Sequence, residues 1–178
     1  MKILEWPAKE LETVAQEVDT FDKELRETVK KMHATMDASG GIGLAANQVG
    51  ILKRVIVMYI PYSSYEEENE IKREFWHDKR MTFVNPKIIE HSSLKESFRE
   101  GCLSFPGIYD YVPRFSQIKV EAFDENGIKH QYDATGLFAC CLQHEIDHID
   151  GIVFFKRMSR LKAKMIKSKV AKRIHSSS

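Results

Sequence analysis

The spacing of apolar residues predicts an amphipathic helix near the start of the chain. Residues 1–19 mix polar and apolar types around Pro7 and predict an irregular lead-in. Apolar residues then recur at intervals of three and four, which is typical of a helix with one buried face, and Asp19 or Thr20 could cap its start. This spacing favours a core role over a ligand role for its members, which are Phe21, Leu25, Val29, Met32, His33 and Met36.

Shorter runs with a period of two, or rich in β-branched residues, predict strands. Residues 117–123 alternate between apolar and polar types, and 129–133 return after an Asp-Glu-Asn-Gly turn, so we expect a hairpin. In residues 81–89, Asn85-Pro86 interrupts the strand pattern. The remaining predicted strands are 54–60, 97–102 and 152–155.

A second helix is predicted where an apolar run, 137–142, leads into Gln143-His144-Glu145-Ile146-Asp147-His148. Asp133 or Thr135 could cap this helix, and Gly151 would end it. With 3.6 residues per turn, His144 and His148 lie one turn apart on the same face, so both imidazoles can reach one cation. Glu145 would then lie beside the cation, where it can take a proton from a water molecule there.

This motif has a simpler alternative, a buried helix that carries two surface histidines. Placing two His and one Glu in an otherwise apolar helix is costly unless something satisfies them, which favours the metal interpretation. A metal that supports hydrolysis usually has three protein ligands and one open position. Cys102, in Glu100-Gly101-Cys102-Leu103-Ser104, is the candidate third ligand. A core role for it stays open, because free Cys is among the most buried residue types.

Residues 40–50 are dense in Gly and Ala and interrupt the first helix. Such a segment allows the backbone to approach a ligand or a packed neighbour closely. It lacks the preceding strand and the following Lys-Ser or Lys-Thr of a phosphate loop. Gln48 carries an amide that can donate two hydrogen bonds, and its role could be structural or functional.

Composition is that of an ordinary soluble globular protein, with 43% hydrophobic and 30% charged residues in a 178-residue chain. No signal peptide is evident, and the longest apolar run, 55–60, is too short to cross a membrane. Three cysteines, two of them adjacent, form a poor disulfide framework and indicate a reducing cytoplasm.

Charge is distributed unevenly along the chain. No Asp or Glu follows Asp150, whereas nine Lys and Arg do, so residues 151–178 carry +9 and the first 150 residues carry −8. We therefore divide a single domain into a catalytic part, 1–155, and a basic helix and tail, 156–178. A basic appendage on an acidic body favours a polyanionic partner. The apolar stripe of this helix is predicted to contain Leu161, Met165, Ile166, Val170 and Ile174.

Three motifs together resemble those of peptide deformylases, in the same order and over nearly the whole chain. They are Gly41-Ile42-Gly43-Leu44-Ala45-Ala46-Asn47-Gln48, then Glu100-Gly101-Cys102-Leu103-Ser104, and finally His144-Glu145-Ile146-Asp147-His148. The basic final helix is similar to that of the Gram-negative form. The resemblance implies an α+β fold in which small mixed or antiparallel β-sheets wrap around a central metal-binding helix. It also implies a metal-dependent hydrolase that removes the N-formyl group from the N-terminal formylmethionine of new polypeptides and releases formate.

The resemblance further implies a role for each site residue. Cys102, His144 and His148 would hold one Fe²⁺ ion per chain, which Zn²⁺ or Ni²⁺ can replace, although these ligand types alone would favour zinc. Glu145 would act as general base, with the Gln48 amide and the Leu103 backbone N–H stabilising the oxyanion. Glu100 and Arg114 would form an ion pair. The substrate would contact Ile42, Gly43, Gly101, Leu137, Cys140 and Cys141.

The sequence departs from the family pattern in two places. Tyr109 stands where many bacterial members have Arg, so peptide preference is expected to differ, and the loop 62–79 is longer than usual. Other functions predict other features. A zinc protease or aminopeptidase needs a third ligand after His148, where only His175 follows, and a non-catalytic binding module would lack a ligand or the base.

Partners follow from the same reasoning. Nascent formylated polypeptides are the expected substrates, and no membrane or DNA partner is expected. The basic tail has two interpretations that stay open, a solvated helix packed on the body and a ribosome-docking element that binds rRNA phosphates.

Overall fold

The computed structural model describes residues 1–60 and 79–176, with side chains to Arg173. The predicted loop 62–79 therefore lies almost entirely outside the described residues. In chain order the elements are η1 (Lys9–Glu12), α1 (Lys23–Ala38), β1 (Gly43–Ala45), η2 (Ala46–Val49), β2 (Val55–Tyr59), β3 (Arg80–His91), β4 (Lys95–Gly101), β5 (Tyr109–Phe115), β6 (Gln117–Phe123), β7 (Lys129–Thr135), α2 (Gly136–Ile149), η5 (Phe154–Arg157) and α3 (Arg160–Ser176).

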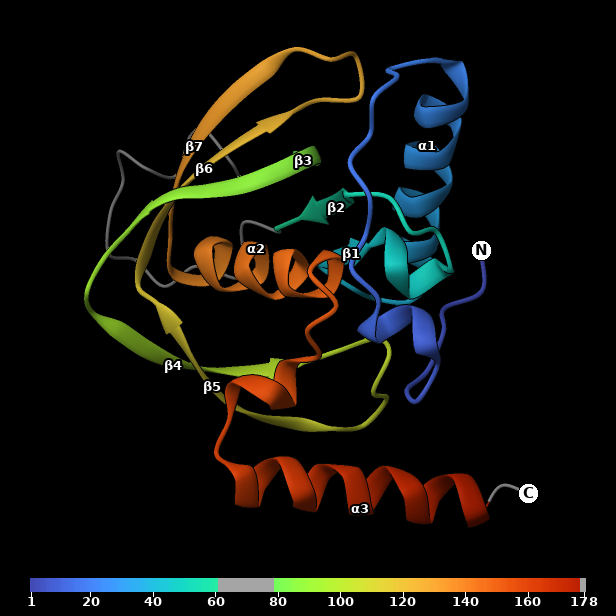
Figure 1. Ribbon diagram of the computed structural model, residues 1–178, viewed down its shortest axis with the longest axis vertical. Helices are drawn as coiled ribbons and strands as arrows, with labels where there is room; N and C mark the ends of the chain where they lie inside the picture. Colours follow the sequence, from blue (N-terminus) through green and yellow to red (C-terminus); the bar gives the residue numbers. More distant parts are fainter. Residues whose placement is uncertain (61–78, 177–178) are drawn as a thin grey trace.

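Two antiparallel sheets enclose α2. The larger has the strand order β1-β2-β3-β6-β7, and β4 pairs with β5 in a separate two-stranded ribbon. Figure 1 shows α2 running between the larger sheet and this ribbon. The inner face of the larger sheet packs on the apolar side of α2 through residues such as Phe83, Ile118 and Phe138. The predicted α+β class, with small sheets around the helix that carries both histidines, is confirmed.

The first helix, α1, covers the outer face of the larger sheet. Its cap is Asp22, whose Oδ1 accepts from Leu25 N at 2.9 Å, so the predicted caps Asp19 and Thr20 are wrong by a few residues. Four of the predicted stripe residues are buried, whereas Phe21 and His33 lie at the margin of the stripe and are half-buried. The buried four are Leu25, Val29, Met32 and Met36.

Asn85-Pro86 distorts β3 without ending it. Asn85 has a φ of 52°, and the pairing of β3 with β6 shifts register between Val84 and Lys87. The Asn85 side chain accepts from Val18 N at 2.8 Å and donates to Val18 O at 2.9 Å. The bulge therefore fastens the N-terminal segment to the sheet, and the strand continues to His91.

One strand predicted in the later part of the chain is absent, and another strand is new. Residues 152–155 do not form a strand, because Phe154 and Phe155 begin the 3₁₀ turn η5 and are buried from all sides. β5 was not predicted. The hairpin of β6 and β7 and the strand β4 agree with prediction.

The final helix, α3, lies along one edge of the molecule, below the ribbon and η5 (Figure 1). Ile166 and Val170 join the cluster of Leu11, Phe105 and Phe155. Leu161 and Met165 are 70% and 63% exposed, so their predicted place in the buried stripe is wrong, and the Ile174 side chain lies outside the described atoms. The turn η5 spans the predicted boundary at 155 and 156, and that division stays a prediction. In the described part of the chain, no helix combines the length and apolar character needed to cross a membrane.

Candidate active site

Three donor side chains converge where α2 meets the end of β4. His144 and His148 lie one turn apart on α2, and Cys102 directly follows β4. Their sulfur and ring nitrogen atoms all lie within 4.8 Å of one another. Cys102 Sγ is 3.2 Å from His148 Nε2, although the two residues are 46 positions apart in sequence. The fold therefore gathers the two histidines and the cysteine into one cluster.

A carboxylate on β4 fixes the orientation of His144. Its Nδ1 lies 2.7 Å from Glu100 Oε2, so Nδ1 carries the proton and Nε2 keeps its lone pair for the cluster. Burial is the main cause that lowers the pKa of His148, and the charge of Arg114 adds to it. The neutral form is the form of imidazole that binds metals.

The donor set fits a divalent transition metal. One thiolate and two imidazoles suit zinc or iron. Among the described residues, two buried polar atoms of this cluster, Glu145 Oε2 and His148 Nδ1, have no hydrogen-bond partner. Burying such an atom costs about 1–3 kcal/mol when nothing satisfies it. Glu145 Oε2 thus fits a site that also receives water, as a hydrolytic metal centre does.

Behind the cluster lies a chain of buried ion pairs. Arg114 Nε and Nη2 donate to the two oxygens of Glu100 at 2.7 and 2.9 Å, and Arg114 Nη1 donates to Asp147. Arg157 in turn donates to Asp147. Burial alone would raise the pKa of Glu100, but the hydrogen bonds from Arg114 and His144 outweigh it and lower this pKa to about 2.

The predicted pair of Glu100 and Arg114 is confirmed, whereas sequence reasoning missed Asp147 and Arg157. Asp147 is 4% exposed on a helix that is buried almost throughout. A signal was available for Asp147, because a carboxylate in such a helix requires a cationic partner. No sequence pattern singled out Arg157 from the other basic residues that follow it.

Glu145 is buried beside the donors. Burial raises its pKa to about 7, with the charge of Glu100 adding to the rise and the charge of Arg114 opposing it. A carboxyl group with a pKa near neutral can both accept and donate a proton at physiological pH. Gly43 makes room for it, because a Cβ on Gly43 would lie 2.5 Å from Glu145 Oε1 and 2.8 Å from Cys141 Sγ.

Gln48 connects the glycine-rich segment to the segment after β4. Its Oε1 accepts from Ala45 N at 2.8 Å, and its Nε2 donates to Ser104 Oγ at 3.2 Å and to Cys102 Sγ at 3.6 Å. Gln48 and Ser104 are each 1% exposed. The side chain therefore has a structural role, and its amide N–H₂ also lies next to the donor cluster. Sequence reasoning missed Ser104 as its partner.

A cleft of about 560 Å³ opens onto the cluster. Cys102, His144 and Glu145 line it, whereas His148 contacts the cluster but is not among the residues that line the cleft. All the other residues predicted for the site also line it, namely Ile42, Gly43, Gln48, Gly101, Leu103, Leu137, Cys140 and Cys141. Apart from His148, which joins them through the donor cluster, the sequence-predicted site residues thus line a single cavity.

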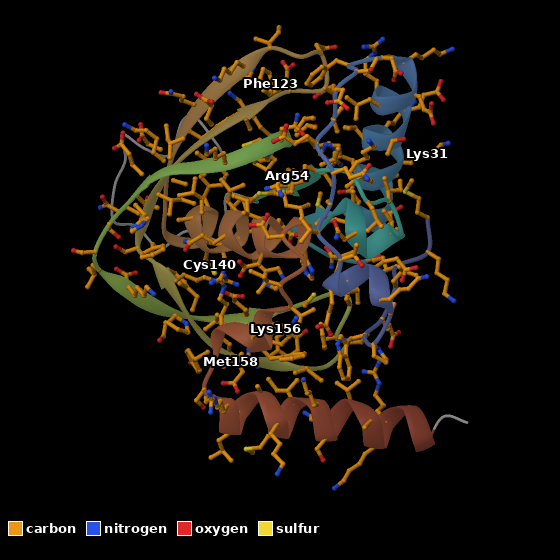
Figure 2. The ribbon with its side chains drawn as sticks, viewed as in Figure 1. Lys31, Arg54, Phe123, Cys140, Lys156 and Met158 are labelled. Atoms are coloured by element: carbon orange, nitrogen blue, oxygen red, sulfur yellow. The ribbon has the colours of Figure 1, made fainter. Side chains whose placement is uncertain are left out.

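The two adjacent cysteines of α2 form part of the wall. Figure 2 places Cys140 on α2 in the middle of the molecule, and its Sγ donates to Glu100 Oε1 at 3.3 Å. Burial raises the pKa of both thiols, with Glu100 adding to the rise for Cys140 and Glu145 for Cys141. Both thiols therefore stay protonated and neutral, and in this they differ from a thiolate that binds a metal.

The rim of the cleft contains a cation that sequence reasoning missed. Tyr109 lines the cleft, as does Arg99, and Arg99 Cζ lies 4.9 Å from the centroid of the Tyr109 ring. Although Tyr109 stands where many bacterial members have Arg, the rim still contains a guanidinium, which Arg99 on β4 supplies. Nothing in the spacing of Arg99 distinguishes it from other surface charges, so this signal is visible only in three dimensions.

Comparison with known proteins gives a consistent result. The sequence profile of a family described as polypeptide deformylase matches residues 1–164. A peptide deformylase from Neisseria gonorrhoeae is 44% identical over 173 residues, which cover 97% of this chain and 95% of that protein. One from Chromobacterium violaceum is 42% identical with the same coverage.

Solved structures agree with the sequences. A crystal structure of peptide deformylase from Ehrlichia chaffeensis has a TM-score of 0.90 and 39% sequence identity, and the match covers 99% of this chain and 98% of that one. A structure of the enzyme from the same organism in complex with actinonin has a TM-score of 0.86 at 39% identity, covering 97% and 96%. Likeness in sequence and in fold extends over the whole chain, so this chain belongs to the peptide deformylase family.

Proposed function

We propose how the residues of the cleft share the reaction of this family, the removal of the N-formyl group from the N-terminal formylmethionine of new polypeptides with release of formate. The chain is a metal-dependent hydrolase. Cys102, His144 and His148 would hold one metal ion. The observation that carries this assignment is the meeting of their three donor atoms within 4.8 Å, with Cys102 and His144 also lining the cleft.

We propose Fe²⁺ as the native metal, with Zn²⁺ or Ni²⁺ able to replace it. The proposal for iron rests on the family, because the donor types alone would suit zinc equally well. When bound, a divalent cation polarises a carbonyl group and lowers the pKa of water to about 7. The residues that would hold the ion include Cys102 and His144, which line the same cleft as Glu145, and this supports the role.

Glu145 would move the proton. Water adds to the formyl carbon, the bond between that carbon and the amide nitrogen breaks, and formate and a free amine are released. Glu145 would accept the proton from the water and pass it to the departing nitrogen, the general acid–base role. Its burial, its pKa of about 7 and the absence of a hydrogen-bond partner on Oε2 among the described residues support this assignment.

Two hydrogen-bond donors would stabilise the negative charge that develops on the formyl oxygen. Gln48 Nε2 lies 3.6 Å from Cys102 Sγ, and the backbone N–H of Leu103 belongs to the residue that directly follows Cys102. Loss of one such donor typically lowers kcat by about 10²–10³-fold. The bond from Ala45 N to Gln48 Oε1 supports the proposal, because it turns the other end of the amide toward the cluster.

The methionine side chain would occupy the apolar part of the cleft. Ile42, Leu137 and Cys141 offer apolar surface, and Gly43 and Gly101 leave backbone groups accessible. A formyl group carries only hydrogen on its carbonyl carbon, so a crowded centre would exclude an acetyl group. Turnover of an acetyl-methionyl peptide at a rate comparable to that of the formyl peptide would contradict this selectivity.

The experiment that tests the proposal measures formate released from a formyl-methionyl peptide. Protein purified without oxygen is loaded with Fe²⁺ and compared with zinc-loaded and metal-free protein. We expect release that depends on metal, with the highest rate for iron. Cys102→Ser should bind metal more weakly, whereas Cys140→Ser should retain it, because Cys140 lies in the wall. Full metal content and activity in Cys102→Ser would overturn the ligand assignment.

We further propose that the protein works in the cytoplasm and that α3 docks on the ribosome. The three cysteines are free thiols, which suits a reducing compartment. On α3, Lys164, Lys169 and Lys172 are exposed and form no ion pair with another described residue. Replacing these three lysines by Gln should weaken co-sedimentation with ribosomes and its dependence on salt. Unchanged ribosome binding would contradict docking through α3.

A further inference from the structure

One cation at the rim of the cleft has no role in the reaction described above. Arg99 lies on β4, three residues before Cys102, and the alternation of the strand points it away from the interior while Glu100 points inward to His144. Arg99 lines the cleft and is exposed. No described carboxylate forms an ion pair with it.

The guanidinium of Arg99 is held in place by an aromatic support. Its Cζ lies 4.9 Å from the centroid of the Tyr109 ring. That ring in turn lies on the backbone of Gly101, its register partner across the ribbon, where a Cβ would overlap the ring atoms. An Arg stacked on a ring keeps its N–H groups free at the edge, where they can bind a carboxylate in bidentate fashion.

The charge of Arg99 is not cancelled by the other groups of the cleft. Glu100 is paired with Arg114 and hydrogen-bonded to His144, and Glu145 is only 4% exposed. Tyr109, by contrast, is 59% exposed. The outer part of the cleft therefore presents a positive charge next to an aromatic surface.

The distance between Arg99 and the metal donors corresponds to the first residues of a bound peptide. A strand advances about 3.3 Å per residue, so Arg99 lies about 10 Å along the chain from Cys102. A substrate whose formyl group is at the metal has its second and third residues about 3–7 Å beyond its first, if it is extended. With the length of its own side chain, Arg99 can reach the side chains of these two residues.

We propose that Arg99, supported by Tyr109, binds a carboxylate on one of the two residues that follow the formylmethionine, and thereby selects acidic over basic peptides. This inference rests on the function proposed above. A purely structural role is the alternative, because an exposed cation–π contact stabilises a protein by about 0.5–1 kcal/mol.

The test compares kcat/KM for three peptides, formyl-Met-Ala-Glu, formyl-Met-Ala-Gln and formyl-Met-Ala-Lys, all amidated at the C-terminus so that no other carboxylate is present. A second set carries the variable residue directly after methionine. We expect Glu to exceed Gln by about 2–5-fold in at least one set, as for an exposed ion pair, and Lys to fall below Gln. The preference should shrink in high salt.

Variants separate the two interpretations. Arg99→Gln should bring the ratio of Glu to Lys peptides to about one, and Arg99→Glu should invert it, an outcome that misfolding cannot produce. Tyr109→Phe keeps the ring and should keep the preference, whereas Tyr109→Leu should weaken it. The matched control is Lys95→Gln. Lys95 also lies on the outer face of β4 over a ring, 4.8 Å from the centroid of Phe115, but it is not among the described residues of the cleft, so its loss should leave the ratio unchanged.

The outcomes distinguish failure of this inference from failure of the proposed function. If the formyl-Met-Ala-Gln peptide releases formate but the wild-type protein does not discriminate Glu from Lys, Arg99 selects no carboxylate. The same conclusion follows if Arg99→Gln keeps the wild-type ratio. If no peptide of either set releases formate in any metal form, the proposed function itself fails.

Discussion

The two long helices of the C-terminal half differ in where their charged side chains lie. Twelve of the 14 residues of α2 are buried, and they include two histidines and two carboxylates. On α3, by contrast, Ile166 and Val170 are the buried side chains among those described, and the basic side chains face solvent. α2 lies between the two sheets, whereas α3 lies at the edge of the molecule (Figure 1).

The difference shows where charge determines the properties of this enzyme. A buried charge must be paired, and breaking such a pair is strongly destabilising because it leaves its partner alone in a medium of low dielectric constant. An exposed charge is screened by water and salt and contributes little to stability. The carboxylates Glu145 and Asp147 of α2 therefore belong to the interior around the site, whereas Lys164, Lys169 and Lys172 of α3 are exposed and form no ion pair with another described residue.

The largest effect on activity is expected from Glu145→Gln. Losing a general acid–base group should lower kcat by about 10²–10⁴-fold, while metal content stays at the wild-type level because Glu145 is not a donor. Formate release and metal analysis on the same preparation check both parts. Activity within a few-fold of wild type would remove Glu145 from the mechanism.

Arg114→Met tests the buried side of the comparison. It leaves Glu100 and Asp147 without their common partner in the interior, so we expect a loss of about 3–5 kcal/mol in the free energy of unfolding. Urea denaturation of the metal-free proteins measures it. The control is Lys162→Met on α3, where the pair with Asp110 is partly exposed and its loss should cost less than about 1 kcal/mol. Equal losses of unfolding free energy in the two variants would mean that burial does not determine the cost of breaking these ion pairs.

Gly43→Ala should have an intermediate effect. The added methyl group would lie 2.5 Å from Glu145 Oε1, in a packed region, so we expect a cost of about 1–3 kcal/mol and a lower kcat. In Gly41→Ala the methyl group would meet the end of the Leu103 side chain at 2.7 Å, which can move, and the cost should be smaller. Thermal unfolding and peptide turnover of the two variants give the comparison.

The smallest effect on the enzyme itself is expected from replacing Lys164, Lys169 and Lys172 by Gln. These exposed lysines form no ion pair with another described residue, so the free energy of unfolding should change by no more than about 0.5 kcal/mol. Turnover of a small peptide should stay at the wild-type rate. This variant is a sharper tool than deletion of residues 160–178, because deletion would also expose the cluster that Ile166 and Val170 cover.

The site was largely predictable because its polar residues stand in apolar or glycine-rich segments, where they form recognisable motifs. The helical spacing of His144 and His148 could be read from the sequence, and the cleft brings the predicted residues together. β5 escaped prediction for a related reason. Its inward positions include Asp110 and Arg114, and Pro113 lies between them, so the usual alternation of apolar and polar residues is absent. The charged residues that form these ion pairs therefore removed the pattern by which β5 could have been predicted.

The other errors arose where two interpretations fitted the local sequence equally well and only tertiary packing decided between them. Leu161 and Met165 form one i, i+4 row on α3, and Ile166 and Val170 form a neighbouring row. Only contact with η5 and the N-terminal segment decides which row is buried. The run at 152–155 is short and apolar, and such runs do not distinguish a strand from a buried turn.

The spacing of 46 positions between Cys102 and His148 also affects the entropy of the unfolded chain. A metal ion held by both ends closes a loop of that length, and a cross-link of this size removes about 3–4 kcal/mol of entropy from the unfolded chain. The loop contains the ribbon of β4 and β5, and an isolated pair of strands is only marginally stable. Binding of a metal at this site would thus stabilise the folded, protease-resistant state as well as complete the active site.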